Sequence, residues 1–385
     1  MLKVVSFLII VFIMPRVGAQ TSTLAMADSL YAVGDYQKAI HLYEKQDSLS
    51  ASVYQKIASA EQARGDLNKA LIAYEKSIQQ NPKLVVAKAN YGKLLRLTYQ
   101  YKKADSVYTE LIQQYPQNPD FQYQLGLIKE KLKNPRAYQF FEKAIQQDAT
   151  HQNALYELAS YHYQNKAFKE TENLTQKALT SAPKNIKMQL LSALNAYSQR
   201  DYSSALKRYQ KVIQLGYTSE SVWKKLGMCY YQEAFITKAI EAYQHVLKFN
   251  AENASAHLYI GKLYLHKEKL EDAERYLLMA LLLSKPKLDE NYQSLGLAYK
   301  GKQEYKKTMH YFKLALEEDP KKMRSQFELA VAADNYYADL QTRLNYYALF
   351  LNKFEEEPKA SIFIKLSKRR ISDLKKEIHL SKKAD

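Results

Sequence analysis

The 385-residue sequence contains one cysteine, ten glycines and nine prolines. A single cysteine cannot form an intramolecular disulfide, and it excludes a zinc or iron–sulfur site built from several cysteines. Glycine and proline together make roughly 5% of the residues, against about 12% in an average protein. Because β-sandwiches, barrels and Rossmann units need many turn residues, this shortage favours helices joined by short loops.

Motifs of catalysis and nucleotide binding are also missing from the sequence. The glycine patterns of the P-loop, the dinucleotide-binding fold and the nucleophile elbow do not occur. The eight histidines are scattered, and none has the spacing H-x-x-x-H or H-E-x-x-H. Cys229 is expected to be a buried, unreactive thiol, because no base that would activate it is identifiable. We therefore expect no enzyme activity, no metal and no cofactor.

The charge of the chain is strongly positive but evenly spread. Lys and Arg number 57 against 40 Asp and Glu, which gives a formal net charge of +17. A nucleic-acid interface would gather its positive charge into one stripe, so no nucleic-acid partner is expected. Hydrophobic residues make 46% of the chain, which is ample for a folded core.

Residues Met1–Ala19 have the pattern of a secretory signal peptide. Lys3 gives a positive start, Val4–Met14 is apolar except for Ser6, and Val17-Gly18-Ala19 supplies small residues before a cleavage site. The apolar run is shorter than the roughly 20 residues of a spanning helix. We expect cleavage after Ala19 and export to the periplasm or cell surface of a bacterium, since a long exported chain of a eukaryote would carry paired cysteines. An uncleaved anchor or a buried first helix is the alternative.

A small residue is followed four positions later by an aromatic one at regular intervals. Six pairs fit this rule: Ala39 and Tyr43, Ala70 and Tyr74, Ala104 and Tyr108, Ala137 and Phe141, Ala205 and Tyr209, and Ala239 and Tyr243. Thr171, Ala273 and Thr308 occupy the same register. The successive small residues are 31, 34, 33, 34, 34, 34, 34 and 35 positions apart, so the chain is an array of repeats.

The residues around these pairs complete a longer pattern. Trp223, Leu226, Gly227 and Tyr230 precede Ala239 and Tyr243 at the spacing W-x₂-L-G-x₂-Y…A-x₃-[FY]. At this point the chain resembles the tetratricopeptide repeat family, over residues 20–354. Each unit reads as two amphipathic helices, which cannot bury their apolar faces alone and must therefore stack. The resemblance implies an all-α fold, a right-handed superhelical solenoid of about nine to ten helix-turn-helix units.

Two places depart from the regular spacing, and the repeat fades near the C-terminus. The fourth unit is one residue short at Lys133-Asn134-Pro135, and the first two units are three residues closer than the rest. Irregular stacking is expected at both places. Residues 355–385 are expected to form a helix, over Lys359–Leu380, that covers the end of the solenoid and continues into a basic tail. The alternative is that its basic residues dock an acidic partner or a membrane face.

In the tetratricopeptide repeat family the first helix of each unit lines a concave groove, and the resemblance implies that partner-binding side chains lie there. The predicted groove residues are Lys93, Arg96, Tyr123, Tyr156, Tyr163, Tyr197, Lys224, Tyr231 and Lys262, with Leu265, Gln293 and Lys300 at equivalent positions. Tyrosine suits such a surface because it offers area and a polar tip. The alternative is that these tyrosines pack against neighbouring helices.

The predicted function is that of a non-enzymatic protein–protein interaction scaffold or adaptor of the bacterial cell envelope, which binds a peptide or protein partner in the groove. The alternative is an extracytoplasmic ligand-sensing or accessory subunit that presents a small molecule or glycan to a membrane partner. After cleavage the chain is not expected to span the membrane, whereas peripheral association with the envelope stays open. Nothing in the sequence indicates an oligomeric state.

Overall fold

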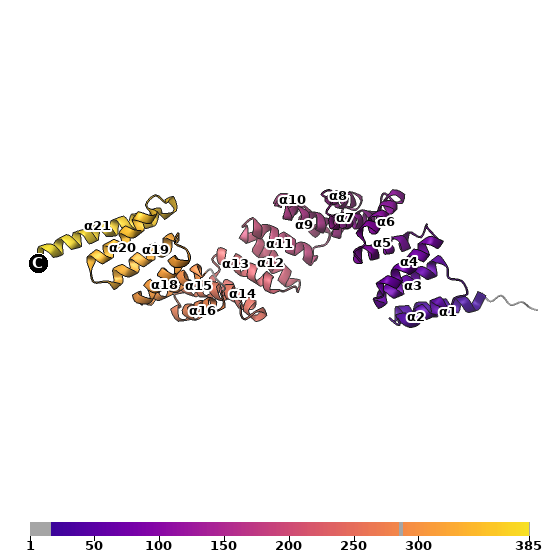
Figure 1. Cartoon of the computed structure of the whole chain (residues 1–385), viewed down its shortest axis with the longest axis horizontal. Coiled ribbons are helices and arrows are strands. Elements are labelled where there is room, and N and C mark those ends of the chain that lie inside the picture. Colours follow the sequence, from indigo (N-terminus) through magenta and orange to yellow (C-terminus); the bar gives the residue numbers. More distant parts are fainter. Residues whose placement is uncertain (1–16, 285–287, 385) are drawn as a thin grey trace, which may run out of the picture. The chain divides into compact units, whose positions relative to one another are not determined.

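The computed structural model describes residues 17–284 and 288–384. Most of the predicted signal peptide Met1–Ala19 lies outside the described residues. The chain divides into two bodies, an N-terminal body (Met1–Pro183) and a C-terminal body (Lys184–Asp385). The described residues form 21 α-helices and one short 3-10 helix (Figure 1). Consecutive helices pack as antiparallel pairs within each body, so the predicted all-α solenoid is confirmed.

Each body is a stack of helix pairs, in which the odd-numbered helix is called the first helix and the even-numbered helix the second. The N-terminal body contains α1 (Val17–Ala32) and α2 (Tyr36–Glu44), α3 (Ala51–Arg64) and α4 (Leu67–Gln80), α5 (Val85–Leu97) and α6 (Tyr101–Gln114), α7 (Pro119–Lys131) and α8 (Ala137–Gln147), and α9 (Gln152–Gln164) and α10 (Phe168–Ser181). The C-terminal body contains α11 (Ile186–Ser198) and α12 (Tyr202–Gln214), α13 (Glu220–Gln232) and α14 (Ile236–Phe249), α15 (Ala254–His266) and α16 (Leu270–Leu283), α17 (Asp289–Gly301) and α18 (Tyr305–Glu318), and α19 (Met323–Tyr336) and α20 (Leu340–Phe354), followed by η1 (Pro358–Ala360) and α21 (Ser361–Ala384).

Side-chain caps and prolines fix where the helices begin and end. Asn118, Ser219 and Asn253 precede first helices, and each accepts a hydrogen bond from a backbone N–H of the first turn, at 3.3, 3.3 and 2.9 Å. Such caps satisfy donors that have no partner inside the helix. Proline follows the last turn of four second helices, where it stops the helix from continuing: Pro82, Pro116, Pro183 and Pro320.

The two helices of a pair cross where a small residue of the first helix meets a large side chain of the second. A Cβ atom added to Gly126 would lie 2.5 Å from the Phe141 ring, and one added to Gly227 would lie 3.2 Å from the Tyr243 ring. Tyr243 and the equivalent Tyr108 are fully buried. The small residue therefore lets the ring sit directly on the helix backbone, which is the contact that the sequence repeat encodes.

The turn inside a pair uses a residue in the left-handed conformation. Nine of these turns have it, and in seven the residue is not glycine, for example Tyr99 at φ 61° and Gln303 at φ 59°. A side chain costs about 1–2 kcal/mol in this conformation. The backbone offsets part of that cost, because the N–H of Gln100 donates to the carbonyl of Leu95 at 2.8 Å and satisfies the end of α5.

The irregular places expected from the sequence are present, and their causes differ. In the fourth pair α8 begins at Ala137, four residues after the left-handed Lys133, whereas the other second helices that follow such a residue begin two residues after it. The short spacing near the N-terminus comes from α2, which has nine residues while α4 has 14. Thr171 takes the place of the usual alanine, and its buried hydroxyl is satisfied because it donates to the Ala167 carbonyl at 2.9 Å.

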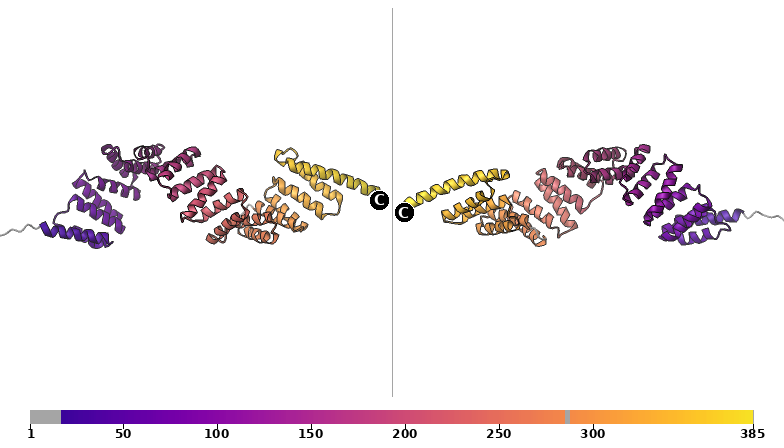
Figure 2. Two further views of the ribbon diagram at one scale, coloured as in Figure 1. Left: turned by 180° about the vertical axis from the view of Figure 1, so that it is seen from behind. Right: turned by 45° about the horizontal axis from the view of Figure 1, so that its top comes forward.

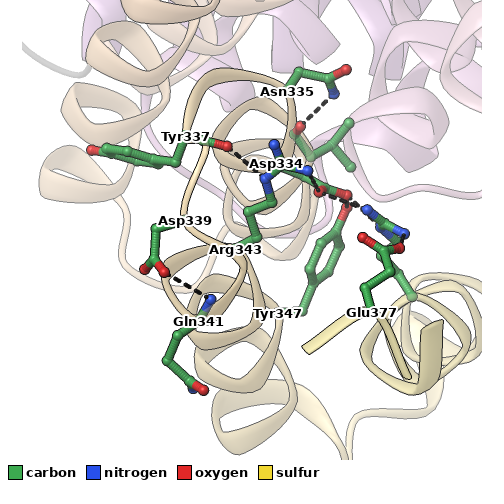
Figure 3. A network of polar contacts seen from close by, with 10 residues as sticks. Asp334, Asn335, Tyr337, Asp339, Gln341, Arg343, Tyr347 and Glu377 are labelled. Atoms are coloured by element: carbon green, nitrogen blue, oxygen red, sulfur yellow. Dashed lines mark hydrogen bonds and ion pairs between the residues drawn. The ribbon is translucent and has the colours of Figure 1, made fainter. Parts of the chain in front are cut away.

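Helix α21 packs on the last pair through an aromatic cluster and a polar network. In both views of Figure 2 it runs alongside α20. The Asp334 carboxylate of α19, which is 12% exposed, accepts hydrogen bonds from Nε and Nη2 of Arg370 on α21, at 2.7 and 3.1 Å. The Tyr347 hydroxyl of α20 donates to it at 3.3 Å, and Arg370 also pairs with Glu377 at 2.8 Å (Figure 3). One carboxylate thus joins three helices. The assignment of residues 355–385 as a separate capping segment stays a prediction.

Gly126 and Gly227 occupy equivalent positions in their repeats, but the space for an added Cβ atom next to the facing ring is smaller at Gly126. The two positions therefore give a matched test. Gly126→Ala is expected to destabilise its pair by about 1–3 kcal/mol, because the methyl group overlaps the Phe141 ring. Gly227→Ala is expected to be close to neutral, since the contact is looser and alanine gains about 0.8–1 kcal/mol of helix propensity. Hydrogen exchange of α7 and α8, and of α13 and α14, measures both effects. Equal losses in the two variants would contradict this reading of the crossing.

The Asp334 network is expected to control the local stability of α21. Arg370→Ala leaves a largely buried carboxylate with fewer donors, which costs about 1.5–3 kcal/mol. Hydrogen exchange should therefore speed up in α21 while α13 to α18 keep their protection. Lys368→Ala is the control, because Lys368 pairs with Glu355 at a half-exposed site. Unchanged exchange in α21 of the Arg370 variant would show that the aromatic contacts alone hold the helix.

Candidate functional site

A pocket of about 690 Å³ in the C-terminal body is lined mainly by four successive first helices, α13, α15, α17 and α19. First helices of neighbouring pairs contact one another directly, as α15 does with α17, so their exposed side chains share one surface. The lining residues are Tyr231, Lys262, Leu265, His266, Glu268, Leu270, Gln293, Ser294, Leu297, Gly301 and Arg324. The first helices, on which the groove residues were predicted, therefore border a pocket in this body.

One tyrosine, Tyr231 of α13, lines this pocket, and it packs against further tyrosine rings. Tyr231 lies edge-on to Tyr259 with ring centroids 5.6 Å apart, and Tyr259 stacks on the buried Tyr243 at 5.1 Å with parallel planes. Burial raises the pKa of Tyr259 above the usual value for tyrosine. Tyr231 is therefore connected to the buried Tyr243 through the ring of Tyr259.

Two lysines of the first helices, Lys262 and Lys300, are paired within the protein. Lys262 Nζ lies 2.7 Å from Glu290 of α17, and Lys300 Nζ lies 2.5 Å from Glu328 of α19. The hydrogen bond from Lys262 lowers the pKa of the Glu290 carboxyl, which keeps the pair ionised. These lysines were predicted to face a partner, but most of their charge is already neutralised by the next helix pair.

Arg324 is the cation of the pocket with the loosest pairing. Its Nε is 4.0 Å from Glu328, which already holds Lys300, and 55% of its side chain is exposed. Close by, the Gln293 side-chain oxygen accepts a hydrogen bond from the Ser325 hydroxyl at 3.0 Å. This bond fixes the amide and leaves its NH₂ group to donate into the pocket.

Two other predicted groove residues of the C-terminal body, Tyr197 and Lys224, differ in their exposure to solvent. Tyr197 is half-buried and packs against Tyr202, with ring centroids 5.8 Å apart. Above its ring lies Lys225 Nζ, 4.7 Å from the centroid, and burial lowers the pKa of Lys225. Lys224, one position earlier, is exposed to solvent. The structure thus places Lys225 on the tyrosine ring, while the predicted groove residue Lys224 is exposed.

The five predicted groove residues of the N-terminal body are all partly buried or covered by neighbouring side chains. Lys93 pairs with Asp120 at 3.3 Å, again between successive first helices. Tyr123 packs between Phe141 and His151, at ring distances of 6.1 and 5.2 Å, and burial raises its pKa. The other three, Arg96, Tyr156 and Tyr163, are half-buried. For Tyr123 the alternative of helix packing describes the observed contacts better than an open groove.

Of the nine predicted residues, Tyr231 and Lys262 share the pocket, together with Leu265 and Gln293. Sequence reasoning missed His266, Leu297 and Arg324. His266 directly follows Leu265, and Leu297 lies four positions after Gln293, and both of these neighbours were predicted. Extending the predicted set by one helical turn would therefore have included His266 and Leu297. Arg324 lies in the last pair, where the repeat pattern fades and gives no register.

The chemistry of the pocket is that of non-covalent recognition. It combines leucine side chains, a tyrosine ring, amide and hydroxyl groups and ion pairs. Among residues 17–284 and 288–384, no group of three or more His, Cys, Asp and Glu is placed to hold a metal ion. Cys229 is buried, and burial raises the pKa of its thiol to about 12. Within the same residues, no helix combines the length and the apolar character needed to cross a membrane.

Three segments of the chain match family models of the tetratricopeptide repeat: residues 51–84, 225–289 and 289–322. The chain is a tetratricopeptide repeat (TPR) protein. The matches at 225–289 and 289–322 cover α15 and α17 and most of α13. The pocket therefore lies mainly on TPR helices.

Several solved structures are similar to this TPR chain at low identity. YrrB, described as a TPR protein with an unusual peptide-binding site, is 16% identical, with a TM-score of 0.45 over 48% of this chain and 95% of that chain. A TPR protein from Parabacteroides merdae is 16% identical, with a TM-score of 0.45 over 65% and 99%. Yeast Tom70 is 12% identical, with a TM-score of 0.39 over 95% and 100%. No curated protein sequence matches significantly.

Proposed function

We propose that this TPR protein is a non-enzymatic binding scaffold, and that it holds a peptide segment of a partner protein in the pocket on α13, α15, α17 and α19. The observation that carries the proposal is the hollow itself, which crosses four successive first helices. A surface built from several repeats suits an extended chain, because successive residues of the peptide meet successive helices.

The side chains of the pocket suggest what such a peptide would offer. Leu265, Leu270 and Leu297 supply apolar area for one hydrophobic side chain. Gln293 offers a donor for a backbone carbonyl, and Arg324 offers a positive charge that an acidic side chain can approach. Because Lys262 and Lys300 are paired internally, they contribute little net attraction. The preferred peptide therefore combines one hydrophobic residue with one acidic residue.

Selection from a random peptide display library against the full chain tests this site. Selected peptides should lose at least about tenfold in affinity on Leu297→Ala or Tyr231→Ala, since each removes a buried contact of 1.4 kcal/mol or more. Arg324→Glu should weaken only the peptides that carry an acidic residue. The matched controls are Leu282→Ala and Lys313→Glu, which change exposed residues of second helices.

Two results would contradict the proposal. Selected peptides that bind the pocket variants and the controls equally well would place the site elsewhere on the chain. The second result is that no peptide is selected, while a small molecule or glycan raises the melting temperature of the wild type but not of the Leu297→Ala variant. That result would favour the alternative of a ligand-sensing or accessory subunit.

We also propose that the protein acts in the cell envelope of a bacterium, and the support for this is the signal-peptide pattern of Met1–Ala19. Expression in a bacterium with a periplasm should yield a chain that begins at Gln20, as measured by intact mass of the periplasmic fraction. Replacing Val11 by Arg interrupts the apolar run and should leave the full-length chain in the cytoplasm. A wild-type chain that keeps Met1 and stays in the cytoplasm would remove the envelope from the proposal.

A further inference from the structure

Helix α21 presents one face to the last helix pair and the opposite face to solvent. On the packed face, the Phe363 ring lies 4.9 Å from Phe327, and Leu374 is fully buried in the same cluster. Arg370 holds the Asp334 carboxylate from the side of this face. These contacts fix the rotation of α21 about its axis, so the side chains of its outer face are directed away from the core.

Positive charge is concentrated on that outer face. The segment Ser361–Ala384 contains eight Lys and Arg against two Asp and Glu. Its outward basic residues, Lys365, Lys368, Arg369, Lys375 and Lys376, are all exposed. Among the described residues, only Lys368 of these five has a carboxylate within 4.0 Å, namely Glu355.

This pattern differs from that of the repeat helices. There, half-buried lysines such as Lys262, Lys300 and Lys322 each meet a carboxylate of a neighbouring helix at 2.8 Å or less. The repeats therefore pair part of their positive charge internally. Other repeat lysines, such as Lys103 and Lys211, are exposed on separate helices, whereas α21 gathers its exposed cations on a single helix.

Exposed apolar residues accompany the cations. Ile362, Leu366 and Leu380 are 64%, 46% and 66% exposed. At 3.6 residues per turn they lie within about 40° of one another around the helix axis, next to Arg369 and Lys376. Asp373 falls in the same sector between Leu366 and Leu380, so the exposed apolar side chains of the outer face are mainly Ile362 and Leu366, next to a sector of basic residues. Helices that lie in a membrane interface also combine exposed apolar and basic side chains.

We propose that the outer face of α21 binds an anionic lipid surface, with the helix axis parallel to the membrane plane. Charge complementarity supplies the attraction, because each basic residue near an anionic leaflet adds to binding. Ile362, Leu366 and Leu380 would enter the interface between the headgroups. An acidic polypeptide would also meet the cations, but a straight helix face about 36 Å long matches an extended flat surface better than a single peptide.

Co-sedimentation of the full chain with lipid vesicles tests the proposal. The probes are vesicles of phosphatidylcholine alone and vesicles with about 30% phosphatidylglycerol, both at about 0.1 M salt. The wild type should bind the anionic vesicles at least about tenfold more tightly, and about 0.5 M salt should remove most of this preference. Because Met1–Ala19 is common to every variant, only differences between variants and between vesicles are interpreted.

The decisive variant is Lys365→Glu/Arg369→Glu/Lys376→Glu, which should lose the preference for anionic vesicles. The matched control is Lys103→Glu/Lys211→Glu/Lys313→Glu, which makes the same change of charge at three exposed lysines of second helices and should bind within about twofold of the wild type. A second variant, Ile362→Ser/Leu366→Ser, keeps the charge and should bind at least about threefold more weakly, because two apolar side chains no longer enter the interface.

Three outcomes would overturn the proposal. The first is equal binding of the wild type to neutral and anionic vesicles. The second is an equal loss in the α21 variant and its charge-matched control, which would reduce the effect to net charge. The third is binding of polyglutamate through α21 without any binding to vesicles, which would assign the face to an acidic protein instead. The helical circular dichroism of each variant verifies that the chain is folded.

Discussion

The structure depends on the close crossing of two helices inside each pair. A residue without a large side chain, such as Gly126, lets an aromatic ring of the second helix rest on the backbone of the first. This contact fixes the angle and the depth of the pair, and the apolar faces that remain can only be buried by the next pair. The stacking of pairs, the shared surface of the first helices and the pocket on that surface all follow from a contact that recurs about every 34 residues.

The same constraint explains why the sequence predicts the fold better than the site. The crossing needs particular residue types at fixed spacing, so Ala239 and Tyr243 reveal their pair without any structure. A groove position is defined by what a side chain does not touch, and that depends on the rotation between pairs. Tyr123 illustrates the difference, because it has the spacing of a groove residue but is covered by His151. Lys224 and Lys225 are another example. Lys224 is exposed to solvent, whereas Lys225, about 100° further around the helix, lies over the Tyr197 ring.

Glycine is scarce for a reason that differs from the one suggested by the sequence. Short turns alone would still require glycine, because they pass through the left-handed conformation, but seven of the nine left-handed turn residues are not glycine. Several of the ten glycines lie instead at helix crossings, where Cβ would meet a ring. At the turns, residues other than glycine adopt the left-handed conformation, and capping hydrogen bonds offset part of its cost. Glycine is needed instead at the helix crossings, where a Cβ atom would overlap a side chain of the second helix.

The ion pairs between first helices also depend on the order of the repeats along the chain. Lys262 meets Glu290, the second residue of α17, whereas the second residue of α19 is Arg324. Loss of the ninth repeat by recombination would therefore bring Lys262 against an arginine, although every helix crossing would remain intact. Repeat arrays grow and shrink readily in evolution because their units are alike in shape. In this chain the units are alike in shape but not in charge, so removal of a unit would place side chains of unmatched charge at the new contact between repeats.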